Sequence, residues 1–189
     1  ISNYTGPNCY TITRTYRATD ECNLFTECTQ IITVNDDTKP VINPQAQDKT
    51  VECDGNGIVA ELTAWLNDHG GARATDNCSA TGNLVWTYAP NPAVLSDLCG
   101  ATGAVTVTFT VTDECNNSST TTATFTVEDT TPPSITCPAP VTVQCAVDVP
   151  QPDINLVIAS DQCGTVTVTH QGDVTSNYTG PNCYTITRT

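Results

Sequence analysis

Cysteine is the residue type that could do most chemistry in this chain. Eleven cysteines occur among 189 residues, a density typical of proteins that form disulfides in an oxidising compartment. Zinc binding is disfavoured, because no Cys-x-x-Cys pair occurs and neither His69 nor His170 lies near paired cysteines. We therefore interpret the cysteines as a disulfide framework.

Acidic side chains are the second candidate group. They cluster where modules join or at loop tips: at Asp20-Glu21, in NDDTKP (residues 35–40), at Asp76, in the TDEC turn at residues 112–115 and in EDTTPP (residues 128–133). Calcium prefers carboxylate oxygens, so a linker and an adjoining hairpin could clamp two folded units through one ion. The alternative is that these are solvated turn residues, or carboxylates that accept hydrogen bonds from loop amides. No cofactor is required, and the candidate calcium ligands are Asp36, Asp37, Glu128, Asp129 and Asp113.

The sequence shows no recognisable catalytic group. His69 and His170 are the only histidines, and neither accompanies a serine or cysteine nucleophile in a known motif. The Asp and Glu pairs lie in loops that recur along the chain, which fits a structural role better than a unique active site. We predict that the protein is not an enzyme.

A long repeat dominates the organisation of the chain. Residues 2–15 read SNYTGPNCYTITRT, and residues 176–189 read the same, so the period is 176 − 2 = 174 residues. Cys183 is therefore the next copy of Cys9, and 11 − 1 = 10 cysteines belong to one period. An exact repeat of this length indicates a tandem array.

A second, weaker repeat is nested in the first. Residues 15–34 resemble residues 108–127, at an offset of 115 − 22 = 93 residues. We predict two homologous modules per period. Residues 38–131 form a complete module, residues 132–189 form the N-terminal part of the split module, and residues 1–37 form the C-terminal part of the preceding copy of it.

Threonine alternates with apolar residues in several segments, and this period of two predicts half-buried antiparallel strands. Residues 60–69 instead have helical spacing and end at Gly70-Gly71, which predicts one short helix that packs Leu62, Trp65 and Leu66 on the strands. The predicted fold is all-β: tandem immunoglobulin-like β-sandwich modules, stapled by disulfides, with one short helix in the complete module. The predicted strands include residues 10–13, 105–112, 124–127 and 166–169.

Comparison of the modules suggests how the cysteines pair. In an immunoglobulin-like sandwich the loops that carry Cys78 and Cys115 share one end. We therefore expect Cys78–Cys115 and Cys53–Cys99, with Cys145–Cys183 by analogy, although four cysteines allow three connectivities. The matched positions are Cys53 with Cys145, Cys78 with Cys163, Cys99 with Cys183, and Cys115 with Cys22.

Two cysteines, Cys28 and Cys137, have no counterpart in the complete module. A mutually bonded pair would be lost together. We therefore expect Cys137 to bond to Cys28 of the following copy, which would tie the first strand of the split module to its last.

Charge and hydropathy exclude two kinds of partner. The formal net charge is −14, with six Lys plus Arg, so the chain cannot bind nucleic acid by neutralising phosphates. No apolar run approaches the length that spans a bilayer. We expect neither nucleic-acid binding nor membrane insertion in this segment.

Three motifs carry a resemblance to a known family. AWLNDHGGARATDNC (residues 64–78), CGATGAVTVTFTVTDEC (residues 99–115) and DTTPPSITCP (residues 129–138) are similar to HYR-like (hyalin-repeat-like) immunoglobulin-fold tandem repeats of giant Bacteroidetes cell-surface proteins and adhesins. The resemblance covers essentially the whole chain. One departure is Asn23-Leu24 and Asn116-Asn117 where the family usually has Gly-Asn, and asparagine tolerates positive φ.

The resemblance implies an exported protein, held at the cell surface or in a surface filament. It also implies an O-glycosylation signal at Asp129-Thr130-Thr131, with Thr130 as the modified residue. We expect a structural repeat unit of an extracellular fibre or giant adhesin that acts as a rigid, disulfide-stabilised stalk. The alternatives are a multivalent glycan- or protein-binding module and a filament subunit completed by strands of its neighbour. The expected partners are adjacent copies of the repeat and a surface glycan or protein.

Overall fold

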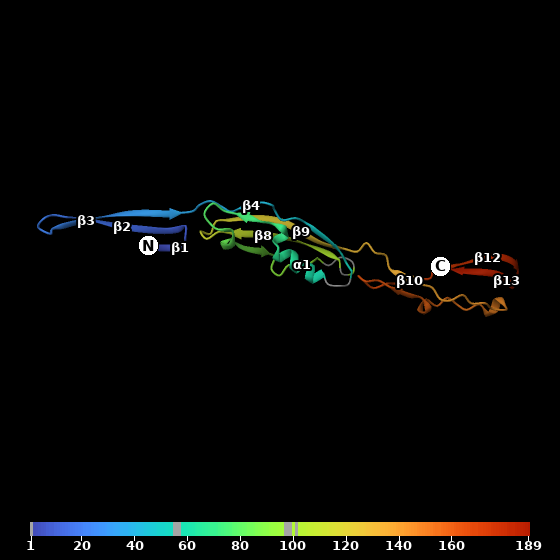
Figure 1. Cartoon of the computed structure of the whole chain (residues 1–189). Helices are drawn as coiled ribbons and strands as arrows, with labels where there is room; N and C mark the ends of the chain where they lie inside the picture. Colours follow the sequence, from blue (N-terminus) through green and yellow to red (C-terminus); the bar gives the residue numbers. More distant parts are fainter. Residues whose placement is uncertain (1, 55–57, 97–99, 101) are drawn as a thin grey trace.

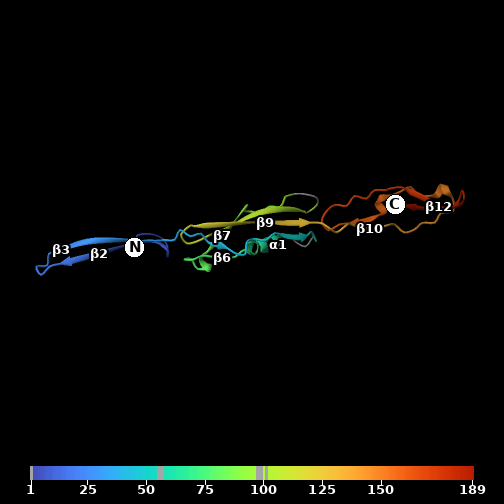
Figure 2. The ribbon, with the colours of Figure 1, turned by 90° about the horizontal axis from the view of Figure 1, so that it is seen from above.

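The protein is elongated, with three parts following one another along one axis (Figure 1). The computed structural model describes residues 2–54, 58–96, 100 and 102–189. We call residues 2–37 the N-terminal part, residues 38–131 the central part and residues 132–189 the C-terminal part. The same order along the axis is visible from above (Figure 2).

The central part is a four-stranded sheet with one covered face. The strand order is β5-β9-β8-β7, in which β5 is parallel to β9 and the other pairs are antiparallel. The covering elements are a helix and a separate two-stranded sheet. The sheet strands are β5 (Lys49–Glu52), β7 (Val85–Ala89), β8 (Gly103–Thr112) and β9 (Ser118–Glu128), and the covering elements are α1 (Ile58–Asn67), β4 (Val41–Ile42) and β6 (Ala74–Thr75). Short 3-10 turns lie at His69–Gly71 and Thr81–Asn83.

The core follows the alternation of β8. Val105, Val107 and Phe109 are buried, whereas the threonines between them are not, because successive side chains of a strand point to opposite faces. Trp65 of α1 lies against Phe109 and Phe125, with ring centroids 5.3 Å and 5.6 Å apart. The predicted helix and its packing residues are confirmed.

The N-terminal part is a three-stranded sheet of β1 (Ser2–Gly6), β2 (Cys9–Thr19) and β3 (Phe25–Asn35). Its main hairpin has the same register as the β8–β9 hairpin: Tyr16 pairs with Cys28 and Phe109 pairs with Thr121, and 109 − 16 = 93 and 121 − 28 = 93. Tyr16 is nevertheless 51% exposed, while Phe109 is 0% exposed. The two hairpins therefore share their pairing but differ in what covers them.

The C-terminal part contains two antiparallel strand pairs, of which only the second is a hairpin. The β12–β13 pair repeats β1–β2 at the longer period, since Gly180 pairs with Cys183 as Gly6 pairs with Cys9. The strands are β10 (Ser134–Thr136), β11 (Ile158–Ser160), β12 (Asp173–Gly180) and β13 (Cys183–Arg188), and 3-10 turns lie at Ala146–Asp148 and Ile154–Leu156.

Residues 166–169 are not a strand in the structure, contrary to the sequence prediction. A strand needs a neighbour to satisfy its backbone groups. In the central part, β7 follows the matching loop and pairs with residues 108–112 of β8. The corresponding residues of the split module are 15–19, and after residues 166–169 they recur only in the following copy.

The fold is all-β with one α-helix among the described residues, as predicted. The layer that faces the four-stranded sheet consists of α1 with the β4–β6 pair rather than a second large sheet. The immunoglobulin-like sandwich stays a prediction. No helix in the described part of the chain is long and apolar enough to cross a membrane.

Candidate junction sites between the modules

Two disulfides connect the three parts of the molecule. Cys9 bonds to Cys115 and Cys53 bonds to Cys163, with Cα atoms 5.7 Å and 5.8 Å apart. The first joins the N-terminal part to the central part, at what we call the first junction. The second joins the central part to the C-terminal part, at the second junction.

These bonds replace the predicted pairs. Cys115 bonds to Cys9 rather than to Cys78, and Cys53 bonds to Cys163 rather than to Cys99, which lies outside the described residues. The predicted Cys145–Cys183 bond is absent too, since both are free thiols. The prediction assumed that loops at one end of a module bond to each other. In the structure Cys53 ends the sheet, where its N–H donates to the Glu128 carbonyl at 2.8 Å, and it faces the next part instead.

Three carboxylates converge at the first junction. Asp36 follows β3 in the linker, Asp76 follows β6 and Asp113 follows β8. Each offers an oxygen, and these oxygens all lie within 4.8 Å of one another. Residues 77 positions apart along the chain are brought together here (113 − 36 = 77), because the linker runs over two loops at the end of the central sheet.

The loops that carry these carboxylates are held by their own amides. Asp113 Oδ1 accepts hydrogen bonds from the Cys115 and Asn117 amides, both at 2.8 Å. Asp76 Oδ2 accepts from the amides of residues 78 and 79 at 2.9 Å, and Asp36 Oδ1 accepts from the amide of residue 38 at 3.1 Å. The carboxylates are therefore fixed in place.

Two oxygens of the cluster remain without a partner. Asp36 Oδ2 and Asp76 Oδ1 are buried and make no hydrogen bond within the described part of the protein. Asp36 is only 7% exposed. Among the described residues, no lysine or arginine forms an ion pair with Asp36, Asp76 or Asp113. Carboxylate oxygens at this spacing are of the kind that hard cations take as ligands.

The second junction has two of the three corresponding carboxylates. Asp129 and Asp161 lie within 4.8 Å of each other and of Cys163 Sγ, whose bond to Cys53 removes it as a thiolate ligand. Asp161 Oδ1 accepts from the Cys163 amide at 2.7 Å, as Asp76 does from Cys78.

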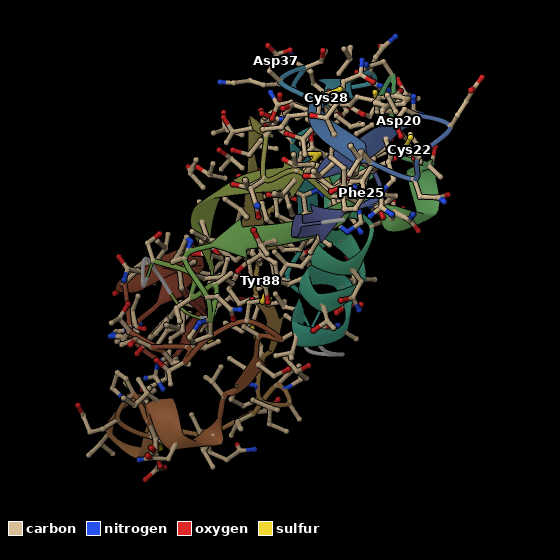
Figure 3. All side chains as sticks on the ribbon, turned by 90° about the vertical axis from the view of Figure 1, so that its left-hand side faces the viewer. Asp20, Cys22, Phe25, Cys28, Asp37 and Tyr88 are labelled. Carbon is tan, nitrogen blue, oxygen red and sulfur yellow. A yellow bond between two sulfur atoms is a disulfide. The ribbon has the colours of Figure 1, made fainter. Side chains whose placement is uncertain are left out.

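The residue that matches Asp113 is Asp20, in the turn of the β2–β3 hairpin. Its Oδ1 accepts from the Cys22 amide at 2.9 Å and the Leu24 amide at 2.8 Å, so this turn has the same hydrogen bonds as the Asp113 turn. Asn23 and Asn116 both have positive φ, 63° and 69°, which confirms that asparagine takes this role. Figure 3, viewed along the long axis from the hairpin end, shows Asp20, Cys22 and Phe25 together at the turn.

The predicted calcium ligands are only partly brought together. Asp36 and Asp113 belong to one cluster and Asp129 to the other, whereas Asp37 and Glu128 are exposed and belong to neither cluster of described residues. Asp37 lies at the outer edge of the molecule in Figure 3. Asp161 is not among the candidate acidic residues of the sequence analysis, and Asp76 is among them but not among the predicted ligands. Their sequence signal is the Asp two positions before each matched cysteine, in DNC and DQC.

Glu52 anchors the linker at the second junction. Its carboxylate accepts hydrogen bonds from the Thr130 amide at 2.8 Å, the Thr130 hydroxyl at 2.9 Å and the Thr131 hydroxyl at 3.1 Å. The hydrogen bond from the Thr130 amide is the main reason that the pKa of Glu52 lies below its ordinary value. The predicted glycosylation residue Thr130 is exposed, and its hydroxyl is engaged with Glu52.

Both histidines have structural contacts. His69 stacks on Trp86, with ring centroids 4.6 Å apart, and burial lowers its pKa, with Arg73 adding to the effect. His170 contacts Asp173 at 2.9 Å in the C-terminal part.

No model of a known protein family matches the chain, and no curated protein matches it closely enough to count as a relative. The resemblance to hyalin-repeat-like modules stays a prediction from the quoted motifs.

Proposed function

We propose that the chain is a structural repeat of an extracellular filament or giant adhesin, in which consecutive modules are locked end to end as a rigid stalk. One observation carries the proposal: both disulfides among the described residues join parts that the repeat pattern assigns to different modules. A disulfide within a module protects that module alone. A disulfide between modules transmits tension along the array and restricts bending.

Contacts around the first junction also oppose bending. The Asn8 side chain donates to the Cys78 carbonyl at 2.9 Å, and the Asn117 side chain donates to the Asp36 carbonyl at 2.9 Å. The backbone approaches closely at Gly6, where a Cβ atom would lie 2.7 Å from the Glu114 carbonyl oxygen. These contacts join the N-terminal and central parts independently of the Cys9–Cys115 bond.

The second junction is similarly close. A Cβ atom on Gly100 would clash with the Cys163 carbonyl oxygen, and Glu52 holds the linker through Thr130 and Thr131. The prolines at 132 and 133 fix backbone dihedrals directly after these residues. Neither linker is free to behave as a flexible coil.

The test is small-angle scattering on arrays of increasing numbers of periods. A rigid stalk gives a maximum dimension that grows in proportion to the number of periods, with a nearly constant cross-section. Growth close to the square root of chain length, as for a flexible linker, or a compact particle would contradict the proposal. The mass of the native polymer under reducing, denaturing conditions separates one long chain from subunits completed by strands of a neighbour.

A further inference from the structure

We propose that each junction carries a second disulfide, made with the neighbouring copy of the repeat: Cys78 with Cys145 of the preceding copy, and Cys22 with Cys99 of the preceding copy. This inference deepens the proposed function and rests on it. With these bonds every module is joined to the next by two covalent links, and a junction with two links cannot swivel about one of them.

The two observed bonds show which cysteine positions pair between neighbouring modules. Cys53 bonds forward to Cys163 of the next module. Cys145 matches Cys53, in TVQC and TVEC, and Cys78 matches Cys163, in DNC and DQC. The same bond made one module earlier along the array therefore joins Cys145 of the preceding copy to Cys78.

The other observed bond gives the second pair in the same way. Cys9 bonds forward to Cys115. Cys99 matches Cys183, which is the next copy of Cys9, and Cys22 matches Cys115. The equivalent bond joins Cys99 to Cys22 of the following copy. Cys99 is outside the described residues, so its assignment rests on the sequence match.

The surroundings of Cys78 support its pairing. Its amide donates to Asp76 as the Cys163 amide donates to Asp161. Cys78 follows Asp76 by two positions, just as Cys163 follows Asp161. Cys163 likewise lies beside Asp129 and Asp161. Cys78 thus occupies at the first junction the position that Cys163 occupies at the second, and its thiol is free.

Cys22 is placed like Cys115. Both follow an aspartate that caps the turn through their amides, and both hairpins have the same register. Cys115 uses this position to reach the preceding part of the chain. Cys22 is free and exposed at the tip of the β2–β3 hairpin, where the preceding module would lie.

The geometry of the central part also supports the expected bond between Cys28 and Cys137. Thr121 matches Cys28, and its hydroxyl oxygen accepts a hydrogen bond from the Ala46 amide at 3.1 Å. Cys137 matches the Ile42-Asn43 stretch, which lies three to four residues before Ala46. The bond would therefore form close to a buried contact of the central module, and all ten cysteines of a period would be paired.

The chemistry is ordinary thiol oxidation. Two thiols become one disulfide by losing two protons and two electrons to the disulfide of a thiol–disulfide oxidoreductase, which becomes a dithiol. Attack by one thiolate on that disulfide gives a mixed disulfide, which the second thiolate resolves. The oxidising compartment supplies the oxidant.

Peptide mapping of the native array tests the proposal. The unreduced protein is alkylated, digested with thermolysin and analysed by mass spectrometry. Thermolysin cleaves before apolar residues and can separate Cys137 from Cys145 at Val141 or Val143. We expect linked peptides that join Cys78 to Cys145 and Cys22 to Cys99. Alkylated Cys78, or a peptide linking Cys78 to Cys115, would overturn the proposal.

A variant makes the test specific. Cys78→Ser should leave Cys145 alkylated in every period while the Cys53–Cys163 peptide is recovered unchanged, and Ser79→Ala is the matched control in the same loop. If Cys145 is alkylated equally in the control, the pairing is wrong. If scattering shows a rod but peptide mapping finds Cys78 alkylated, only the second disulfide is refuted. If scattering shows a flexible array but mapping finds all the expected linked peptides, only the rigid stalk is refuted.

From a separate observation we infer that the cluster of Asp36, Asp76 and Asp113 binds calcium. Asp36 Oδ2 is a buried acceptor without a partner among the described residues, on a side chain that is 7% exposed and directed into the cluster. Asp76 Oδ1 is in the same situation. Several carboxylate oxygens at such spacing suit a hard cation that takes oxygen ligands in flexible geometry.

The site is expected at every junction. Asp129 and Asp161 provide two of its carboxylates at the second junction, and Asp20 of the following copy would provide the third from a turn with the same hydrogen bonds as the Asp113 turn. The array should then bind one calcium ion per junction. The ion would connect a linker to two loops of the next module.

Calorimetric titration of the native array with calcium chloride tests this inference. Extracellular calcium modules bind with dissociation constants of about 0.1–1 mM, and we expect this range. Asp76→Asn should remove half of the sites, those at the first junction, whereas the control Asp37→Asn removes the same charge from an exposed neighbour and should keep them all. If calcium gives no heat of binding up to about ten times that concentration, or if both variants lose binding sites equally, the proposed calcium site is wrong.

Discussion

Glu52 accepts two hydrogen bonds from Thr130, one from its amide and one from its hydroxyl, at 2.8 Å and 2.9 Å. The residues are 78 positions apart, and the contact holds the linker against the end of β5. We predict that Glu52→Ala speeds hydrogen exchange at the Thr130 amide several-fold without unfolding the central part. Exchange measured by NMR provides the test, with Glu61→Ala as the control. Unchanged exchange at Thr130 would contradict the anchoring role.

The same contact should depend on pH. The folded pKa of Glu52 lies below its ordinary value of 4.5, so its contribution is fully present above the unfolded pKa and is lost as pH falls through the folded pKa. Protection of the Thr130 amide should therefore persist at neutral pH and decline only below about pH 4.5. In Glu52→Gln, which keeps an acceptor but cannot titrate, this decline should disappear.

The lowered pKa of His69 predicts that stability also depends on pH closer to neutrality. Burial lowers its pKa in the folded protein below 6.5, so the unfolded chain binds the proton more readily. Stability is then fully present above about pH 6.5 and decreases as pH falls towards the folded pKa. Urea unfolding between about pH 7.5 and 5.5 should show this slope, and His69→Asn should reduce it, since asparagine tolerates the positive φ of 56°. An equal slope in the variant would assign the effect to other groups.

The burial of Phe109 predicts a large change in the stability of the central part. Phe109 is 0% exposed and contacts Trp65 of α1. Phe109→Ala should lower the free energy of unfolding of the central part by about 3–5 kcal/mol, measured by urea unfolding with tryptophan fluorescence. Val59→Ala is the control, because Val59 is 77% exposed on α1 and should change stability by less than about 0.5 kcal/mol. Similar losses in both would contradict the assigned core.

The elements could be predicted from the sequence because their signals are local. Alternation in β8 and the spacing of Leu62, Trp65 and Leu66 depend only on neighbouring residues. Residues 166–169 show the limit of such signals, since their alternation is clear but no partner strand pairs with them.

The junctions were harder to predict because they depend on which elements meet in space. The match between modules identified equivalent cysteines, but it could not tell whether a loop faces its own module or the next. For the same reason the sequence did not group Asp76 with Asp36 and Asp113, because these partners come from a linker and a distant turn. Once Cys53–Cys163 and Cys9–Cys115 are known, the repeat indicates their proposed equivalents, Cys145–Cys78 and Cys99–Cys22.

Reduction should separate the mechanical role of the disulfides from the stability of the core. Both observed bonds join neighbouring parts, and the contacts of Trp65 with Phe109 and Phe125 involve no sulfur. We predict that reductant makes an array flexible in small-angle scattering while tryptophan fluorescence shows a folded central part. Its unfolding midpoint in urea should still fall, because bonds that close loops of 106 and 110 residues restrict the unfolded chain and typically contribute about 2–4 kcal/mol each. A central part that unfolds in reductant alone would show that the disulfides hold the module itself, and an array that stays rigid would show that the carboxylate clusters and linker contacts suffice.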